Sequence, residues 1–388
     1  MKNKIKLILT SLILSFLFFN SFIKADDFNF DISEIEILND GNLFKGLKRG
    51  TITTDDELVI TANEFEYDKT LNLLNAEGNV EVYDKINDYK IFTKKITYIK
   101  NKEKIFTKGR TQAQISSKYN FDTENLIFLR NEKKLISSNK STILENEKIS
   151  YELDKFEYLL DEKILKGINV KITTNINQPE VARDILNFKD GIFNLDKKNF
   201  IASDTKINLR KNSFEDTRND PRVYGVSSKK EGNITTLKKA IFTSCEKSER
   251  CPPWSIKAKT ITHDKNKKQL IYDQSIVRIY DIPVFYFPKF FHPDPSVKRQ
   301  SGFLQPQINN SNILGSSLNI PYYHVISENK DITFKPTFFD SDIYMIQNEY
   351  RQKNKRSTLT TDIGFTKGYS SSLQKNKKNN IGHFFSKF

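Results

Sequence analysis

A repeat of short alternating strands limits what this chain can fold into more than any other feature. An isoleucine, a tyrosine and a glycine return after 31 residues, as Ile60, Tyr67 and Gly78 and again as Ile91, Tyr98 and Gly109. Each unit reads as strand, turn and strand without helical periodicity, and looser copies follow at residues 119–144 and 149–170. One such unit cannot bury its apolar face alone, so the units must stack. The repeat predicts an all-β fold: a roll, solenoid or elongated jelly roll.

A stack of this kind has a continuous apolar interior. That interior is either a groove for an apolar ligand or an ordinary sandwich core, filled by its own side chains. The pattern alone favours the ordinary core, because alternating strands need no ligand to bury their apolar face.

The chain begins as an export signal does. Lys2, Lys4 and Lys6 precede an apolar run at residues 7–19, and Ala25 closes the segment. The run is shorter than the roughly 20 residues that span a bilayer, which disfavours an uncleaved anchor. We predict cleavage after Ala25 and an exported protein.

The pattern changes twice in the second half of the chain. Pro283, Pro288 and Pro293 interrupt a dense aromatic stretch, and because proline is excluded from helices and central strands we predict an extended, kinked connector. Beyond Gly302 the strands alternate cleanly. In residues 331–338, Ile332, Phe334 and Phe338 share one face and Thr333, Lys335 and Thr337 share the other. Charged side chains on an inner face suit a water-filled lumen, so we predict strands of a membrane β-barrel.

The net charge of +14 points, for an exported chain, to phosphate-bearing lipids or a membrane surface rather than to nucleic acid, or simply to a solvated surface. The two cysteines, Cys245 and Cys251, are disulfide candidates, paired with each other or with cysteines elsewhere.

Motifs for catalysis are not found in the sequence. It contains neither a glycine-rich phosphate loop nor a nucleophile elbow, and its four histidines are scattered without metal-ligand spacing. We interpret the protein as a non-enzyme, with no catalytic residues, no cofactor and no metal site.

Several ordered motifs carry a resemblance to a known family. They are Cys245 followed by Trp254–Ile256 and His263–Asp264, then Pro283–Pro288, Arg299–Pro306, Pro321–Tyr323, Asn329–Thr333 and Glu349–Arg351. In this order they resemble the signature of the LptD (OstA, Imp) family of lipopolysaccharide-assembly outer-membrane proteins. The repeats at 57–170 separately resemble the family's periplasmic domain.

The resemblance implies five segments. They are a signal peptide at 1–25, an extended leader at 26–56, a periplasmic OstA-like β-jelly-roll or β-taco at 57–260, an aromatic connector with the barrel entry at 261–298, and the first strands of an outer-membrane β-barrel at 299–388. The last segment is too short for a wide barrel. We therefore expect a truncated sequence.

The resemblance also implies a function. The roll receives lipopolysaccharide from a periplasmic bridge protein of the same fold, shields its acyl chains in an apolar groove, and passes it to a barrel that holds a plug lipoprotein and opens sideways into the outer membrane. Burying acyl chains is favourable by about 0.8 kcal/mol per methylene. The groove candidates are Ile60, Ala62, Val80, Val82, Ile91 and Ile96.

Four further residues receive roles from the resemblance. Pro306 and Pro321 match prolines on the first two barrel strands and are candidates for the lateral gate, because proline weakens strand pairing. Cys245 matches a cysteine that pairs with one near the barrel's end, but the extra Cys251 leaves the partner open. Two alternatives remain: a soluble periplasmic lipopolysaccharide-binding bridge protein, and an adhesin-like structural β-protein.

Overall fold

The computed structural model describes residues 28–209, 220–246, 252–294, 297, 299–304, 306–311, 315–340, 343–369 and 379–388. The predicted signal peptide lies outside these ranges. Within them, regular structure consists of β-strands and two short 3-10 helices, η1 (Lys100–Lys102) and η2 (Glu180–Ala182). The predicted all-β fold is confirmed.

The chain divides into two compact units. The first comprises residues 1–211, 220–232 and 241–247, and the second comprises residues 212–219, 233–240 and 248–388. Strand β20 (Ile234–Thr243) is divided between them.

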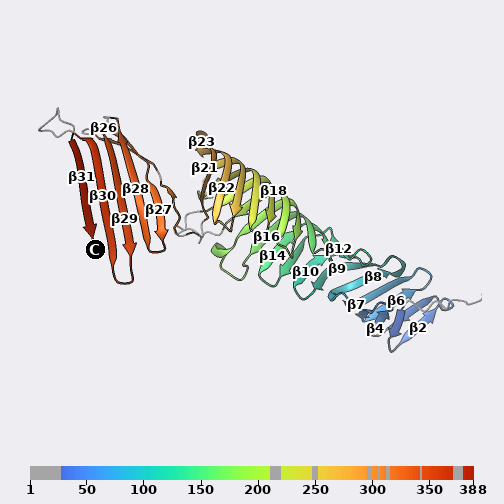
Figure 1. Ribbon diagram of the computed structural model, residues 1–388. Helices are drawn as coiled ribbons and strands as arrows, with labels where there is room; N and C mark the ends of the chain where they lie inside the picture. Colours follow the sequence, from blue (N-terminus) through green and yellow to red (C-terminus); the bar gives the residue numbers. More distant parts are fainter. Residues whose placement is uncertain are drawn as a thin grey trace, which may run out of the picture. The chain divides into compact units, whose positions relative to one another are not determined.

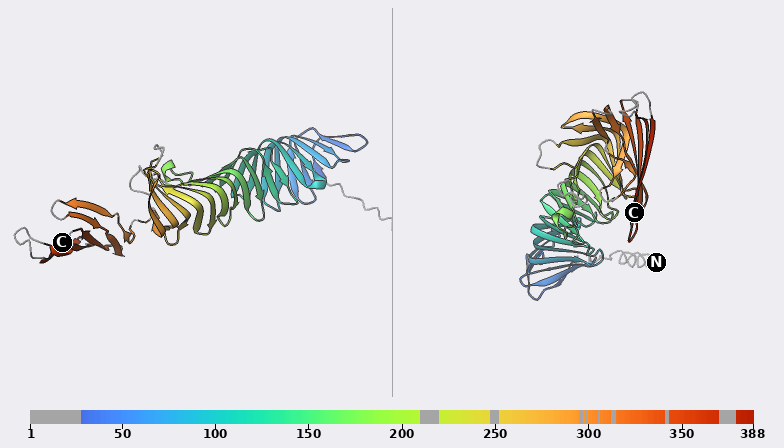
Figure 2. Two further views of the ribbon diagram at one scale, coloured as in Figure 1. Left: turned by 90° about the horizontal axis from the view of Figure 1, so that it is seen from above. Right: turned by 90° about the vertical axis from the view of Figure 1, so that its left-hand side faces the viewer.

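The first unit is a roll of antiparallel strands, stacked one after another along its length in chain order (Figures 1 and 2). Its strands are β1 (Phe28–Asp31), β2 (Ile35–Leu38), β3 (Leu43–Gly46), β4 (Gly50–Thr54), β5 (Leu58–Ala62), β6 (Glu64–Asp68), β7 (Leu73–Asp84), β8 (Tyr89–Ile99), β9 (Lys104–Ile115), β10 (Tyr119–Glu124), β11 (Ile127–Leu129), β12 (Lys134–Ser137), β13 (Ser141–Glu145), β14 (Ile149–Leu153), β15 (Lys155–Leu159), β16 (Ile164–Thr174), β17 (Ile185–Asn194), β18 (Asn199–Asn208) and β19 (Arg222–Glu231).

A corner divides this stack into two half-sheets. Strand β7 pairs with β6 over its first part and with β5 over its second part, and Gly78 and Asn79, both with positive φ, lie at the change. Glycine suits that corner because it adopts positive φ without strain. The same bend returns at Gly109 in β9 and at Asn169 in β16. The 31-residue repeat therefore corresponds to two successive strands that each cross the corner.

The hairpin turns gather in two rows at the free margins of the half-sheets. The first lip consists of the turns at 39–42, 69–72, 100–103, 130–133, 160–163 and 195–198, and the second lip of those at 55–57, 85–88, 116–118, 146–148 and 175–184. Backbone hydrogen bonds join neighbouring turns along each lip. Examples are Arg130 N–H to Glu103 O at 2.9 Å and Asn146 N–H to Lys118 O at 3.0 Å.

The core lies between the two half-sheets. Alternate side chains of each strand point inward, and rings from opposite half-sheets meet there. Tyr89 and Phe128 contact edge to face with centroids 4.8 Å apart, and Phe121 lies 5.6 Å from Phe156. The buried hydrophobic cluster extends from Phe28 to Ala202 as one continuous interior. Residues 28–54, predicted as an extended leader, supply strands β1–β4 to this stack.

The second unit contains a ladder and a separate sheet. The ladder is formed by β21 (Trp254–Asp264), β22 (Gln269–Ile279) and β23 (Ile282–Pro293). The segment that we predicted as a kinked connector is thus strand β23, paired along its length with β22. Its three prolines fit because β23 pairs with β22 on one side, so the missing N–H groups can face away from the ladder.

The separate sheet has eight antiparallel strands. They are β24 (Gly302–Phe303), β25 (Gln307–Ser311), β26 (Gly315–Asn319), β27 (Tyr322–Ser327), β28 (Lys330–Phe339), β29 (Tyr344–Lys353), β30 (Thr358–Tyr369) and β31 (Asn379–Lys387).

Candidate functional site

The six predicted groove residues all point into the roll. Each is at most 2 % exposed, and all belong to the buried cluster. Ile60, Val82 and Ile91 are register neighbours across β5, β7 and β8, whereas Ile96 lies on the other half-sheet opposite Ala76. The interior around them is filled by the protein's own side chains. An acyl chain would therefore reach these residues only if the half-sheets separated.

Tyrosines mark the boundary between this interior and the lips. Tyr67 donates from its hydroxyl to Asn72 Oδ1 at 3.2 Å, and Tyr98 donates to Glu103 Oε2 at 2.7 Å, both on the first lip. On the second lip Tyr151 donates to Glu145 Oε2 at 3.0 Å. Each ring is apolar and buried while its hydroxyl reaches polar groups. The sequence repeat contains Tyr67 and Tyr98, but their place at the rim was not predicted.

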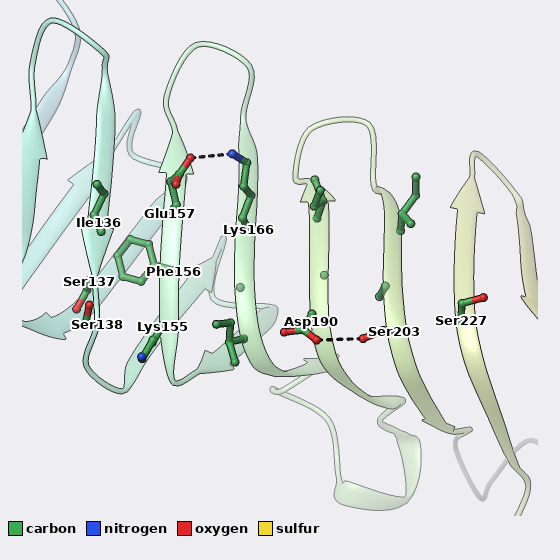
Figure 3. Close-up of a pocket in the computed structure, with 16 residues that line it drawn as sticks. Ile136, Ser137, Ser138, Lys155, Phe156, Glu157, Lys166, Asp190, Ser203 and Ser227 are labelled. Atoms are coloured by element: carbon green, nitrogen blue, oxygen red, sulfur yellow. Dashed lines mark hydrogen bonds and ion pairs between the residues drawn. The ribbon is translucent and has the colours of Figure 1, made fainter.

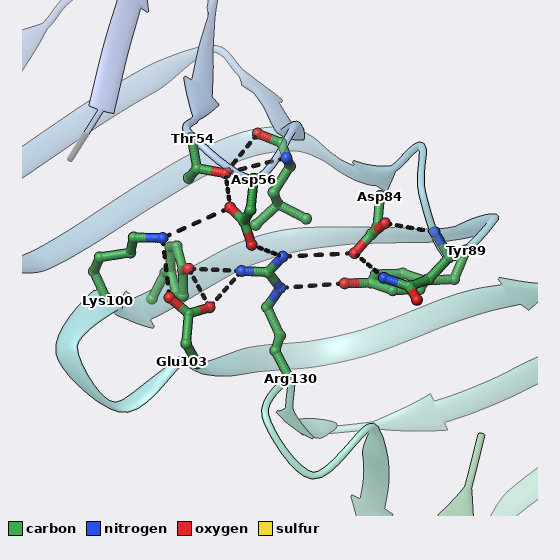
Figure 4. A network of polar contacts seen from close by, with 10 residues as sticks. Thr54, Asp56, Asp84, Tyr89, Lys100, Glu103 and Arg130 are labelled. Atoms are coloured by element: carbon green, nitrogen blue, oxygen red, sulfur yellow. Dashed lines mark hydrogen bonds and ion pairs between the residues drawn. The ribbon is translucent and has the colours of Figure 1, made fainter. Parts of the chain in front are cut away.

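Arg130 joins the two lips by a network of charges (Figure 4). It lies on the first lip with Glu103, to which it donates, while Asp56 and Asp84 approach its guanidinium from the second lip. The Arg130 guanidinium also donates to the hydroxyls of Tyr98, at 2.9 Å, and Tyr89, at 3.3 Å. Its side chain is only 8 % exposed. We call this group the Arg130 clasp, because it holds opposite margins of the roll together.

The clasp favours the ionised form of Asp56 and Asp84. Burial would raise the pKa of Asp56, but hydrogen bonds from Thr54 and Arg130 and the charges of Arg130 and Lys100 lower that pKa to about 2. The pKa of Asp84 is also lowered, because hydrogen bonds and the charge of Arg130 outweigh its burial.

A second bridge crosses the lips further along the roll. Glu145, buried on the second lip, pairs with Lys198 on the first lip. Lys118 on the second lip lies 3.5 Å from Asp196 on the first. Neither bridge was predicted, because the partners are separated by dozens of residues in the sequence.

The outer surface of the roll has a depression of its own (Figure 3). Its volume is 620 Å³, and its lining includes the exposed side chains of Ile168, Ile192 and Ile201. Lys166 and Glu157 form an ion pair at 2.8 Å on its rim. These residues alternate with the buried ones, so the depression is distinct from the interior.

The eight-stranded sheet has two chemically different faces. The register places Phe338 beside Tyr344, and Ile346 beside Phe365, on one face with exposed apolar side chains. The other face carries a polar network, in which Arg351 donates from Nε to Asp331 at 2.8 Å and Gln347 donates to Asp362 at 2.7 Å. The alternation predicted from the sequence is confirmed.

The two predicted gate prolines lie at breaks between short strands. Pro306 separates β24 from β25, and Pro321 separates β26 from β27. Both β26 and β27 pair with β28, so Pro321 interrupts what would be a single strand.

The cysteine predictions are only partly covered by the structure. Cys245 follows β20, and its carbonyl accepts a hydrogen bond from Arg222. Cys251 lies outside the described residues.

Within the described ranges, acidic, histidine and cysteine side chains do not gather in threes as a metal site requires. In the same ranges, no helix is long and apolar enough to cross a membrane.

The fold and its sites define a class: an all-β protein with a long apolar-cored roll and a separate sheet that is polar on one face and apolar on the other. Comparison with known families finds a similarity over part of this chain. The family described as LptD protein matches residues 270–381, which confirms the resemblance that the motifs indicate.

Curated relatives carry the same family name. "LPS-assembly protein LptD" of Legionella pneumophila (strain Paris) is 33 % identical over 144 residues, covering 36 % of this chain and 17 % of the relative. The protein of that name from Polaromonas sp. is 31 % identical over 119 residues, covering 30 % and 14 %. That of Coxiella burnetii is 28 % identical over 133 residues, covering 34 % and 15 %. The matched segment thus spans about a sixth of the length of these relatives.

Among solved structures, the WD40 domain of SCAP from fission yeast covers 93 % of this chain and 88 % of its own at 10 % identity, with a TM-score of 0.13. A score this low does not indicate a shared fold.

Proposed function

We propose that this protein assembles lipopolysaccharide into the outer membrane. The observation that carries the proposal is the match of residues 270–381 to the LptD family, together with relatives named as LPS-assembly proteins. The exported character of the N-terminus and the all-β architecture support it.

In this proposal the two units divide the work. The roll, in the periplasm, holds acyl chains between its half-sheets at residues such as Val80 and Ile91. The eight-stranded sheet belongs to the membrane-embedded part, with its apolar face toward lipid and its polar face toward water. Breaks at Pro306 and Pro321 loosen strand pairing where the wall opens sideways.

The proposed partners follow from the same assignment. A periplasmic bridge protein of the same β-roll fold delivers lipopolysaccharide, and a plug lipoprotein occupies the barrel. Cys245 and Cys251 are the disulfide candidates.

A soluble bridge protein is the second candidate, and the roll alone would suit it. The two-faced sheet favours the first candidate, because a soluble protein gains nothing from exposing Phe334, Phe338, Tyr344 and Phe365 on one face.

Depletion of the protein in the cells that produce it tests the proposal. We expect lipopolysaccharide to disappear from the cell surface, measured by surface labelling, and to accumulate at the inner membrane. A plasmid-borne copy should restore the surface signal. Unchanged surface lipopolysaccharide after complete depletion would contradict the proposal.

A further inference from the structure

A pocket on the polar face of the eight-stranded sheet has the chemistry of a ligand site. Its volume is 470 Å³, within the range of small-molecule sites. The lining comes from residues on both sides of β24 and from β27, β28 and β29: Arg299, Gln300, Leu304, Tyr323, Thr333, Lys335, Glu349 and Arg351. The register explains this convergence, because Tyr323 lies opposite Thr333, and Thr333 opposite Glu349.

Arg299 is held firmly against this face. Its Nε donates to the Tyr323 hydroxyl at 2.9 Å, its Nη1 donates to Glu328 O at 2.7 Å, and its Nη2 pairs with Asp331. Arg351 reaches the same Asp331 from β29 and lies over the Tyr323 ring at 5.9 Å. The two guanidinium groups are therefore fixed in place rather than free in solution.

Positive charge dominates the pocket. Three cations, Arg299, Lys335 and Arg351, face two carboxylates. Asp331, shared by both arginines, has a side chain only 9 % exposed, whereas that of Arg351 is 46 % exposed. Lys335 pairs with Glu349 at 2.5 Å, and Arg351 lies 3.7 Å from the same carboxylate. The surface offered to a ligand is thus cationic, which suits a phosphate group.

Gln300 adds a different requirement. Its side-chain oxygen Oε1 is buried and has no hydrogen-bond partner. A buried acceptor without a donor is unfavourable. Because the Gln300 side chain lines the pocket, a rotation of its amide would bring Oε1 to a ligand hydroxyl. The pocket thus combines cations for an anion with an acceptor for a hydroxyl.

We infer that this pocket binds a phosphorylated sugar. The inference rests on the proposed function and deepens it: the sugar belongs to the headgroup of the transported lipid. The arginines and Lys335 bind the phosphate, and Gln300 accepts from a hydroxyl of the ring.

Calorimetric titration of the whole protein in detergent tests the inference. The probe is the phosphorylated oligosaccharide released from lipopolysaccharide by removal of its acyl chains. We expect Lys335→Gln and Arg351→Gln to weaken binding at least tenfold. The matched control, Lys353→Gln, removes the same charge from the same strand as Arg351 but outside the pocket, and should bind within twofold of wild type.

Two further probes identify the ligand chemistry. Enzymatic dephosphorylation of the oligosaccharide should abolish binding, and inorganic phosphate alone should bind at least tenfold more weakly. Unchanged binding by both charge variants, or equal binding of the dephosphorylated probe, would overturn the inference. Equal affinity for inorganic phosphate would show that the pocket is a general anion site, and would overturn the inference that it recognises a sugar.

Gln300→Leu is a variant that should fold normally, because it leaves the ion pairs of Arg299 and Arg351 with Asp331 intact. We expect it to weaken oligosaccharide binding and to leave phosphate binding unchanged; unchanged oligosaccharide binding would remove Gln300 from the site. Failure of the pocket is distinguishable from failure of the proposed function. Consider a plasmid-borne copy that restores surface lipopolysaccharide in depleted cells while the protein binds the probe independently of Lys335 and Arg351. That pair of results would refute the pocket and leave the proposed function intact.

Discussion

At the scale of single residues, the roll is held closed by charges as well as by its apolar core. Arg130 has carboxylates from both lips around it and is nearly excluded from solvent. A buried charge is tolerated only when it is paired and hydrogen-bonded, and Arg130 satisfies both conditions. Its role could not be predicted from the sequence, because Arg130 and Asp56 are 74 residues apart. The inward direction of Ile60 and Val82, by contrast, followed from simple alternation.

Replacement of Arg130 by methionine should loosen the lips. We expect Arg130→Met to lower the free energy of unfolding by about 3 kcal/mol, because it leaves the buried Asp84 without its cation. Arg110→Met is the control, since Arg110 pairs with Asp122 on the exposed surface and should change stability by less than about 1 kcal/mol. Urea unfolding measures both, and equal effects would contradict the clasp.

The clasp should also make stability depend on pH in the acid range. Asp56 and Asp84 have lower pKa values in the folded protein than their usual 3.8. Their contribution is therefore complete above pH 4 and is lost as the pH falls toward 2. The stability difference between wild type and Arg130→Met should shrink between pH 4 and pH 2 in urea unfolding. A difference independent of pH would show that Arg130 acts through packing.

At the scale of elements, the corner explains why the repeat contains a glycine. Strand alternation and the 31-residue spacing were sufficient to predict strands and stacking. The bend inside each long strand was not predicted, because Gly78 reads equally well as a turn between strands. The pairing of β22 with β23 was also missed, since prolines in an edge strand look the same in the sequence as prolines in a connector.

Alanine substitutions at two glycines of the corner, Gly78 and Gly109, should lower stability to different extents. Gly78 and Gly109 both have positive φ, which is unfavourable by about 1–2 kcal/mol for a residue with a side chain. At Gly78 a Cβ would also lie 2.8 Å from Asn63 Nδ2, whereas at Gly109 it would meet open space. We therefore expect Gly78→Ala to destabilise the protein more than Gly109→Ala in thermal unfolding. The reverse order would contradict the corner geometry.

The break at Pro321 should influence release of lipid if that part of the wall opens. Pro321→Ala would supply the missing N–H and allow β26 and β27 to join along β28, which strengthens pairing. We expect slower appearance of newly made lipopolysaccharide at the cell surface in pulse labelling. Pro293→Ala, on β23 and outside the eight-stranded sheet, should leave the rate unchanged. An unaltered rate for Pro321→Ala would exclude it from the gate.

At the scale of the whole molecule, the chain forms two units with different chemistry, which alternate along the sequence between residues 211 and 248. The sequence was sufficient to predict the repeated strands of the roll and the two-faced strands of the eight-stranded sheet, because a repeat of alternating strands and a run of strands with charged inner faces are distinct patterns. The strand pattern alone favoured an interior filled by its own side chains, and the buried cluster agrees with it. The rings and charges that close the roll were not predicted, since they are brought together from opposite half-sheets. A closed interior also sharpens the proposed function: if the roll carries lipid as we propose, the lips have to part for the lipid to enter.

Photocrosslinking in cells tests most directly whether acyl chains pass through the interior of the roll. A photoreactive residue at Val80 or Ile91, both buried between the half-sheets, should capture lipopolysaccharide during transport. The same residue at Glu81, which follows Val80 on β7 and points outward, should not. Crosslinks from Glu81 with none from Val80 or Ile91 would contradict the central claim.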